Sequence, residues 1–385
     1  MNRHDPSLKN SSSADLAYGL LQINLNAILS NYRQLCQKAP HSITSAVLKA
    51  NAYGLGAEKI APLLEQQGHC RHFFVAHLQE GISLRKVLSH EAQIFVLNGL
   101  ISEAATQFIT HNITPVLNTV QQYKNWQTLA QKNATPLPAI IQLDSGMHRL
   151  GLSEEDVLHL QTEENWLKFL DVKFVISHLA CAADPHNPTN SAQLLKFKKL
   201  AAFFPNAPLS LAASSGIFLG PEWQLDMVRP GAALYGINPT PAHPNPMENV
   251  ITVSGKIIQI RKVNPYSAIG YNGTHITSGP ARIAIVSIGY ADGFFRILSN
   301  KGFAVAPASP ETKLPIIGNI SMDCLCVNIS ALPEHLLTEG SMIELIGANI
   351  PLDCVGEAAK TIGYEILTAL DGRLYKNYSY RARHF

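Results

Sequence analysis

The sequence lacks the cysteine spacing of zinc sites and any hydrophobic run long enough to cross a bilayer. Its six cysteines are scattered over 385 residues, and no Cys-x-x-Cys pair occurs. This spacing argues against a bound metal and against a disulfide framework, and it is typical of reduced thiols. No segment reaches the ~18–20 consecutive apolar residues of a transmembrane helix, so we expect no membrane span.

The sequence also has almost no excess of charge of either sign. Its 30 basic and 28 acidic residues give a net charge of +2, and no basic stripe stands out. Because nucleic acids and acidic membranes attract concentrated positive charge, we expect neither as a partner. The polar segment 1–15 and the short apolar stretch after it do not predict a signal peptide, since no small-residue cleavage site follows. We therefore expect a soluble, cytoplasmic protein.

The first half of the chain contains short apolar runs that alternate with helix-like stretches. Runs that are apolar throughout are typical of parallel strands buried on both faces. The clearest helix-like stretch is 190–204, where Leu195 and Leu200 are both expected on the apolar side. The pattern predicts a (β/α)8 barrel, with a doubly wound sheet as the alternative. The expected strands are 43–49, 72–77, 93–98, 114–118, 139–144, 172–177, 209–214 and 231–236.

The pattern changes at the proline-rich segment 240–246. Beyond it, apolar and polar residues alternate and Gly and Pro mark the turns, which is typical of antiparallel strands. We therefore expect a barrel domain over residues 1–245 and a mostly antiparallel β domain over residues 246–385. Residues 20–28 also alternate, and this strand is expected to pair with the second domain. The strands expected there are 251–263, 281–288, 314–320, 324–329 and 341–347.

One lysine follows an apolar run in an unusual setting. Lys49 directly follows the apolar run 46–48 and stands four residues before Tyr53 and a glycine-rich turn. In a parallel barrel the carboxyl ends of the strands line the active site, where burial lowers the pKa of a lysine. A neutral lysine amine can form a Schiff base with an aldehyde or act as a base. On its own, a lysine at this place would more often begin a solvated loop.

The residues around Lys49 are not isolated, because LKANAYGLG (48–56) resembles the pyridoxal-phosphate lysine motif of alanine racemases. The resemblance extends along almost the whole chain and implies a barrel followed by a β domain. It also implies a head-to-tail homodimer with shared active sites, which interconverts L-alanine and D-alanine and supplies D-alanine for peptidoglycan. Further motifs in the family's order are LDSGMHRLG (143–151), SHLA (177–180), SSG (214–216), VRPGAALYG (228–236), GYNGT (270–274), IGYADG (288–293), SMD (321–323) and YRARHF (380–385).

The resemblance implies a two-base proton transfer, because racemisation removes a proton from one face of Cα and returns it on the other. Lys49 matches the residue that holds pyridoxal phosphate and serves one face. Tyr271 matches the tyrosine that serves the opposite face from the other subunit. His178, counted among the cofactor-binding residues, matches the histidine that hydrogen-bonds this tyrosine. Arg229 matches the arginine at the pyridine nitrogen, which it leaves unprotonated because a guanidinium keeps its own proton.

The remaining site residues are also implied by the resemblance. Backbone amides beside glycines and hydroxyl groups suit a phosphate, and a guanidinium fork suits the substrate carboxylate. The phosphate contacts are Tyr53, Ser215, Gly231, Ala232 and Tyr380, and the substrate contacts are Arg149, Met322, Asp323 and Tyr290.

Three residues depart from the common pattern of the family. Gln142 stands where many members carry a carbamylated lysine, so we expect no carbamate, and its side-chain carbonyl could still accept a hydrogen bond from Arg149. His148 replaces a common glycine and Ser214 a common asparagine. The sequence alone gives no physical account of these two changes.

Other functions stay open at this point. A racemase of serine, of basic amino acids or of several amino acids is the nearest alternative. A decarboxylase with the same two-domain plan should lack the tyrosine of GYNGT, which this chain has as Tyr271. A non-enzymatic cofactor-binding protein of this lysine family is usually a barrel alone, whereas this chain continues into a β domain.

Overall fold

The computed structural model describes residues 17–370 and 372–380, so the segment 1–15 considered for a signal peptide lies outside the described residues. Contacts divide the chain into two units. One unit is continuous, Ile28–Glu248, and the other joins the residues up to Ala27 with those from Asn249 onward. No helix in the described ranges is long and apolar enough to cross a membrane.

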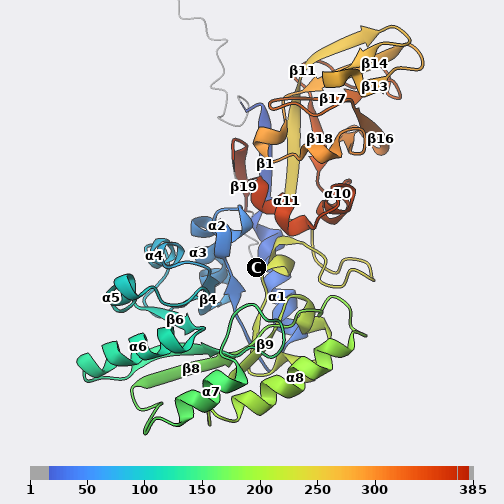
Figure 1. The fold of residues 1–385 in the computed structure, drawn as a ribbon. Helices are drawn as coiled ribbons and strands as arrows, with labels where there is room; N and C mark the ends of the chain where they lie inside the picture. Colours follow the sequence, from blue (N-terminus) through green and yellow to red (C-terminus); the bar gives the residue numbers. More distant parts are fainter. Residues whose placement is uncertain (1–16, 371, 381–385) are drawn as a thin grey trace, which may run out of the picture. The chain divides into compact units, whose positions relative to one another are not determined.

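The continuous unit is a nearly closed parallel barrel, which confirms the predicted fold class (Figure 1). Its sheet has the order β2-β10-β9-β8-β7-β6-β5-β4-β3, and every pairing is parallel. Two consecutive pieces of one segment, β2 and β3, form the two edges of this order, so the sheet curls round on itself. The strands are β2 (Ile43–Thr44), β3 (Ala46–Val47), β4 (His72–Val75), β5 (Gln93–Val96), β6 (Ile113–Leu117), β7 (Leu137–Gln142), β8 (Leu170–Ile176), β9 (Leu209–Ala213) and β10 (Met227–Arg229).

Helices lie outside this ring of strands (Figure 1). Side chains cap several of their N-termini: Thr119, Ser153 and Asn187 each accept a hydrogen bond from a backbone N–H of the first turn. The helices are α1 (Leu25–Lys38), α3 (Ala57–Gly68), α4 (Leu78–Arg85), α5 (Ala105–Thr110), α6 (Val120–Lys132), α7 (Glu154–Gln161), α8 (Pro188–Ala201) and α9 (Pro221–Gln224).

The barrel interior is packed with aromatic rings. The ring centroids of His72 and Phe95 lie 6.0 Å apart, those of His72 and Phe174 5.9 Å, and those of Phe95 and Phe174 6.2 Å. Phe174 belongs to β8, which is not a neighbour of β4 or β5 in the sheet. These contacts therefore cross the interior, and the barrel is a filled core below the site rather than a pore.

Two details of the predicted barrel are wrong. The run 231–236 is not the last strand: Ala232–Tyr235 forms the 3-10 helix η3, and the last strand is β10 just before it. Short apolar runs fit a buried turn of helix as well as a strand, so periodicity could not separate the two. The apolar side expected for 190–204 also fails at Leu195, which is 74% exposed, whereas Leu200 is buried.

The second unit is an antiparallel barrel built round one long strand. Its order is β14-β17-β16-β15-β18-β11-β1-β19, and a further β14–β11 pairing links strands that lie far apart in this order. The pairing of β1 with β19 is parallel. The elements are β1 (Gly19–Asn24), β11 (Ile251–Val263), β12 (Ala268–Ile269), β13 (His275–Ile276), β14 (Ala281–Val286), β15 (Phe303–Ala306), β16 (Ser309–Ile317), β17 (Leu325–Asn328), β18 (Met342–Ile346), α10 (Leu352–Ala358), α11 (Gly363–Ala369) and β19 (Tyr375–Ser379).

The first strand pairs inside this second unit, with β11 and β19. It is shorter than the predicted 20–28, because it ends at Asn24 and α1 begins at Leu25. The side-chain Oδ1 of Asn24 accepts a hydrogen bond from the backbone N–H of Ala27 at 3.1 Å. This contact satisfies an amide of the first helical turn and fixes the change from strand to helix.

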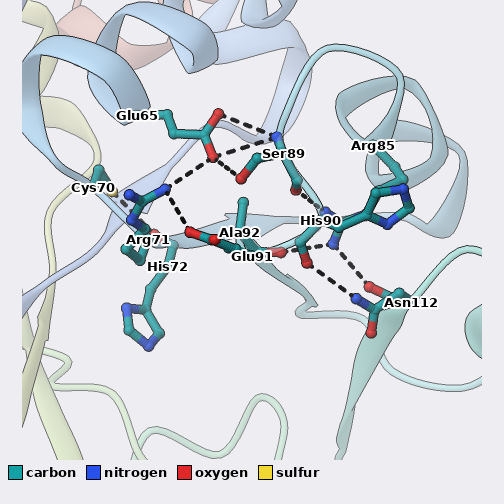
Figure 2. Close-up of polar contacts among 10 residues, drawn as sticks. All are labelled: Glu65, Cys70, Arg71, His72, Arg85, Ser89, His90, Glu91, Ala92 and Asn112. Atoms are coloured by element: carbon teal, nitrogen blue, oxygen red, sulfur yellow. Dashed lines mark hydrogen bonds and ion pairs between the residues drawn. The ribbon is translucent and has the colours of Figure 1, made fainter.

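A polar network at the amino ends of β4, β5 and β6 joins three loops of the barrel (Figure 2). The buried carboxylate of Glu65 accepts hydrogen bonds from the backbone N–H and the hydroxyl of Ser89. The guanidinium of Arg85 donates to four backbone carbonyls, those of Ser89, Ala92, His111 and Asn112. Arg85 therefore ties the segments that enter β5 and β6.

We expect Arg85→Ala to lower the free energy of unfolding of the barrel by about 2 kcal/mol, because partly buried carbonyls lose a charged donor. Thermal unfolding followed by circular dichroism measures this loss. The matched control is Arg33→Ala, since Arg33 is exposed and donates only to the carbonyl of Gln67 at 3.0 Å. Equal melting temperatures for the two variants would contradict the role given to the network.

Candidate active site

The predicted site residues of the barrel lie where its strands end. Lys49 comes two residues after β3, His178 two residues after β8, and Ser215 two residues after β9, while Arg229 is the last residue of β10. Because the strands are parallel, these carboxyl ends open at one mouth, where side chains from separate strands can meet.

The electrostatics of the mouth show that the cationic groups influence one another. Burial lowers the pKa of Lys49, and the positive charge of Arg149 lowers it further, while Glu80 acts in the opposite direction. Burial also lowers the pKa of His178 to about 3, with additional effects from Arg229, Arg149 and Lys49. The mouth therefore holds a lysine that loses its proton more easily than usual and a histidine that is neutral near pH 7.

The chain after Lys49 takes a left-handed turn instead of continuing the predicted strand. Lys49 opens α2 (Lys49–Tyr53), and Ala50, Asn51, Ala52 and Tyr53 have φ between 51° and 55°. L-residues pay roughly 1–2 kcal/mol each for this conformation. Strained backbone of this kind persists where the surroundings fix it, commonly at functional sites. The predicted strand 43–49 extends two residues beyond β3, which ends at Val47.

Arg229 is buried and is held by neutral groups. Its guanidinium donates to the Ser210 hydroxyl and to the backbone carbonyl of Ser177. Burial lowers its pKa to about 10, so it stays charged at neutral pH. No ion pair of Arg229 occurs in the part of the chain that the structure describes. The sequence assigned no role to Ser177 and Ser210, which place this cation: Ser177 stands in the SHLA motif, where only His178 was given a function, and Ser210 stands in no quoted motif.

The predicted phosphate contacts of the barrel come together at the ends of β9 and β10. A Cβ on Gly231 would lie 2.5 Å from the hydroxyl oxygen of Tyr53, so only glycine leaves room there. The Ser214 hydroxyl accepts hydrogen bonds from the backbone N–H groups of Gly231 and Ala233, both at 3.1 Å. Ser214 thus links the loop that carries Ser215 to the loop that carries Gly231 and Ala232, which is a physical account of this departure from the family.

Gln142 is buried, and its side chain does not take the partner considered for it. Its Nε2 donates to the backbone carbonyl of Leu150 at 3.2 Å, and no hydrogen bond between Gln142 and Arg149 occurs among the described residues. Gln142 therefore acts on the backbone beside Arg149, not on its guanidinium.

His148, at a position that is commonly glycine, has φ 54°, a conformation that glycine adopts without steric cost. The Oδ1 atom of Asp144 accepts hydrogen bonds from the backbone N–H groups of Gly146, Met147 and His148, and Oδ2 lies 3.2 Å from His148 Nδ1. Burial acts to raise the pKa of Asp144, but these contacts outweigh it and lower the pKa. Asp144 thus stabilises the strained loop that ends at Arg149.

The other predicted site residues belong to the antiparallel unit. The backbone N–H of Tyr290 donates to Ser321 O at 3.0 Å, so the loops that carry Tyr290 and Met322 lie side by side. Asp323 accepts a hydrogen bond from Arg373 at 2.7 Å. Tyr271 begins the 3-10 helix η4 (Tyr271–Gly273), and 67% of its surface is exposed.

Tyr380 directly follows β19 in the same unit. No cluster of three or more potential metal ligands occurs in residues 17–370 and 372–380.

Two family models match the chain. Residues 23–239 match the alanine racemase N-terminal domain and residues 250–378 match the C-terminal domain. The chain belongs to the alanine racemase family. Tyr380 lies beyond the matched residues, whereas the other predicted site residues lie within them.

Individual alanine racemases are similar over nearly their whole length. The catabolic alanine racemase of Agrobacterium fabrum is 44% identical over 374 residues, which cover 97% of this chain and 95% of the relative. The alanine racemase of Brucella canis is 43% identical, with 94% of each chain covered. The crystal structure from Bartonella henselae, which has covalently bound pyridoxal phosphate, gives a TM-score of 0.90 at 41% identity and covers 94% of this chain and 100% of that one.

The depressed pKa of His178 makes the stability of this racemase-family chain depend on pH. Since the folded value is about 3 and the ordinary value is 6.5, the unfolded chain binds a proton that the folded chain does not bind between these pH values. Stability is therefore present above pH 6.5 and is lost as the pH falls toward 3.

Urea unfolding at pH 7 and pH 5 measures the effect. We expect the wild type to lose about 2 kcal/mol more than His178→Gln over this interval. His41→Gln, which removes an exposed histidine, is the control and should follow the wild type. An identical pH dependence in His178→Gln and the wild type would refute the assignment.

Proposed function

We propose that this protein interconverts L-alanine and D-alanine with pyridoxal phosphate bound at the barrel mouth. The observation that carries the proposal is the position of Lys49, an amine of lowered pKa in the family's lysine motif, among Arg149, His178 and Arg229. Membership of the alanine racemase family and the pyridoxal phosphate in the Bartonella henselae relative support the substrate and the cofactor.

The residues at the mouth fit this cofactor. Lys49 supplies the amine for its aldehyde, and Gly231 lets the Tyr53 hydroxyl, a group that suits a phosphate, approach the end of β10 closely. Arg229 is a buried cation held by neutral groups, which suits a ring nitrogen that can accept a hydrogen bond. When bound, pyridoxal phosphate supplies the electron sink that makes the proton at alanine Cα acidic enough to be moved.

The protein's own task is to move one proton on each face of alanine Cα. Lys49 Nζ exchanges the proton on one face, and its lowered pKa makes the neutral, basic form more accessible than it is for a solvated lysine. The Tyr271 hydroxyl of a second copy of the chain exchanges the proton on the other face. His178 is neutral at this pH and so can hydrogen-bond that hydroxyl as donor or acceptor.

Arg229 limits the reaction to racemisation. Its pKa of about 10 keeps the guanidinium protonated at pH 7, so Arg229 would donate a hydrogen bond to the ring nitrogen of a bound cofactor and would keep its own proton. A ring without the extra charge draws less electron density, which disfavours side reactions such as transamination. Arg149 orients the substrate carboxylate, and Met322, Asp323 and Tyr290 complete the substrate pocket from the second copy.

A homodimer with shared active sites accounts for the exposed apolar surface of the antiparallel unit. Tyr271, Tyr290 and Met322 are 67%, 42% and 52% exposed, and Ile276 is 62% exposed. Exposed apolar side chains next to functional residues are typical of a surface that another chain covers. We accordingly assign residues 1–245 to cofactor binding and residues 246–385 to completion of the partner's site.

The cellular role is also part of the proposal. We place the enzyme in the cytoplasm, where it supplies D-alanine for peptidoglycan. The relative from Agrobacterium fabrum is named a catabolic alanine racemase, and a catabolic role is the alternative for this chain. Growth of a deletion strain with and without added D-alanine distinguishes the two roles, because only loss of supply creates a D-alanine requirement.

We expect Lys49→Ala to lose both racemisation and the visible absorbance of lysine-bound pyridoxal phosphate, because no other amine takes its place. Absorption spectra of the purified proteins, followed by D-alanine formation from L-alanine, measure the two effects. Lys59→Ala is the control, since Lys59 is an exposed lysine of α3. Retention of the visible band in Lys49→Ala would rule out Lys49 as the cofactor lysine.

We expect a mixture of Lys49→Ala and Tyr271→Phe proteins to recover activity that neither variant has alone. A mixed dimer contains one site with both substitutions and one with neither, so recovery requires residues from two chains in each site. Subunit exchange is verified by mass spectrometry of differently tagged chains. Exchange without recovered activity would exclude the shared site.

A further inference from the structure

We propose that Glu80 is a positioning residue for Lys49. It holds the left-handed turn that follows the lysine, residues 50–53, against the end of the neighbouring strand and so fixes the position of the lysine amine. The inference rests on the proposed role of Lys49 as the cofactor lysine. Glu80 belongs to no motif from which a function was expected, and it lies in the first turn of α4.

The carboxylate of Glu80 joins two segments that are distant in the chain. Its Oε1 accepts a hydrogen bond from the backbone N–H of Ala50 at 2.6 Å. Its Oε2 accepts hydrogen bonds from the N–H groups of Ala76 at 2.8 Å and His77 at 3.0 Å. Ala50 directly follows Lys49, and Ala76 directly follows β4, the strand that pairs with β3. One side chain therefore couples the ends of two adjacent strands.

The turn behind Lys49 needs this contact because its first amide has no partner within the turn. The later amides bond locally: Ala52 N donates to Leu48 O and Gly54 N to Ala50 O, both at 2.8 Å. The amide of Ala50 instead donates to Glu80. Without the carboxylate, this N–H would lose its hydrogen bond at the residue where the unfavourable positive φ begins.

Glu80 also contributes charge to the mouth. Of the groups that act on Lys49, Arg149 lowers the pKa of the amine and Glu80 raises it, against the larger effect of burial. His178 also faces these cations and is neutral near pH 7. Loss of the Glu80 charge should therefore lower the pKa of Lys49 further, an effect that a purely structural defect would not produce.

Three substitutions separate the possible roles. Glu80→Gln keeps the shape but removes the charge and turns an NH2 group toward a backbone N–H. Glu80→Asp keeps the charge but is one methylene too short to reach both segments. Glu58→Gln is the matched control, because Glu58 is an exposed carboxylate in the first turn of α3, the next helix along the chain from Lys49.

The test uses purified holoenzyme of all variants. It measures kcat and KM for L-alanine, the pH dependence of kcat, and the release of pyridoxal phosphate, followed as loss of the visible band. We expect Glu80→Gln and Glu80→Asp to lower kcat about tenfold or more with a smaller change in KM, because the amine is misplaced by a fraction of an ångström. Both should release the cofactor faster, and only Glu80→Gln should shift to lower pH the limb of the profile that reports the ionisation of Lys49.

Wild-type kcat and cofactor release in both Glu80 variants would overturn the inference. If Glu80→Gln fails to fold, Glu80→Asp and its cofactor release decide the question alone. Failure of the proposed function is a separate result, because the wild type itself would then lack the visible band or alanine racemisation. An active wild type with unaffected Glu80 variants refutes only the role of Glu80.

Discussion

The gathering of cations at one partly buried mouth is the constraint on which the rest of the site depends. Burial opposes charge on Lys49, His178 and Arg229; Arg149 adds to this effect on Lys49, and all three cations add to it on His178. Like charges in a medium of low dielectric repel strongly, so the group with the weakest hold on its proton gives it up. Burial, with the neighbouring cations in addition, thus leaves a histidine that is neutral near pH 7 and a lysine that gives up its proton more easily than usual.

Neutral hydrogen-bond partners limit the free-energy cost of burying the charge of Arg229. Arg229 donates to a hydroxyl and a backbone carbonyl, which satisfy its N–H groups without cancelling its charge. Ser177 is held in turn, since its hydroxyl donates to the carbonyl of Leu143 at 2.7 Å and lies 2.8 Å from the Ser145 hydroxyl. A carboxylate beside Arg229 would add a second buried charge and would cancel the charge of the guanidinium at the mouth. The buried serines therefore keep the cation in place and leave its charge for the ligand.

Strand position was predictable from the sequence wherever the chain repeats a regular pattern, and backbone conformation was not. Apolar runs located the barrel strands because burial on both faces leaves little room for polar residues. The same reasoning failed for Ala232–Tyr235, whose apolar residues are buried in a 3-10 turn. It also carries no information on the positive φ values of Ala50–Tyr53. The motifs identified site residues of the barrel, and in the structure these residues lie at the carboxyl ends of its strands. The motifs assigned no role to Glu80, Ser177 and Ser210, because hydrogen bonds between distant segments leave no local pattern.

The positions that depart from the family indicate what the loops of the mouth require. Ser214 joins two loops through backbone N–H groups, Gln142 binds the carbonyl of Leu150, and Asp144 supports the positive φ of His148. In each case the structure compensates with a contact to backbone atoms, whose positions are set by the strand ends. The loops therefore depend more on the geometry of the barrel than on the particular side chains at these positions. Arg149 accordingly acts on the pKa of Lys49 although the side chain of Gln142 binds the carbonyl of Leu150 and not the guanidinium.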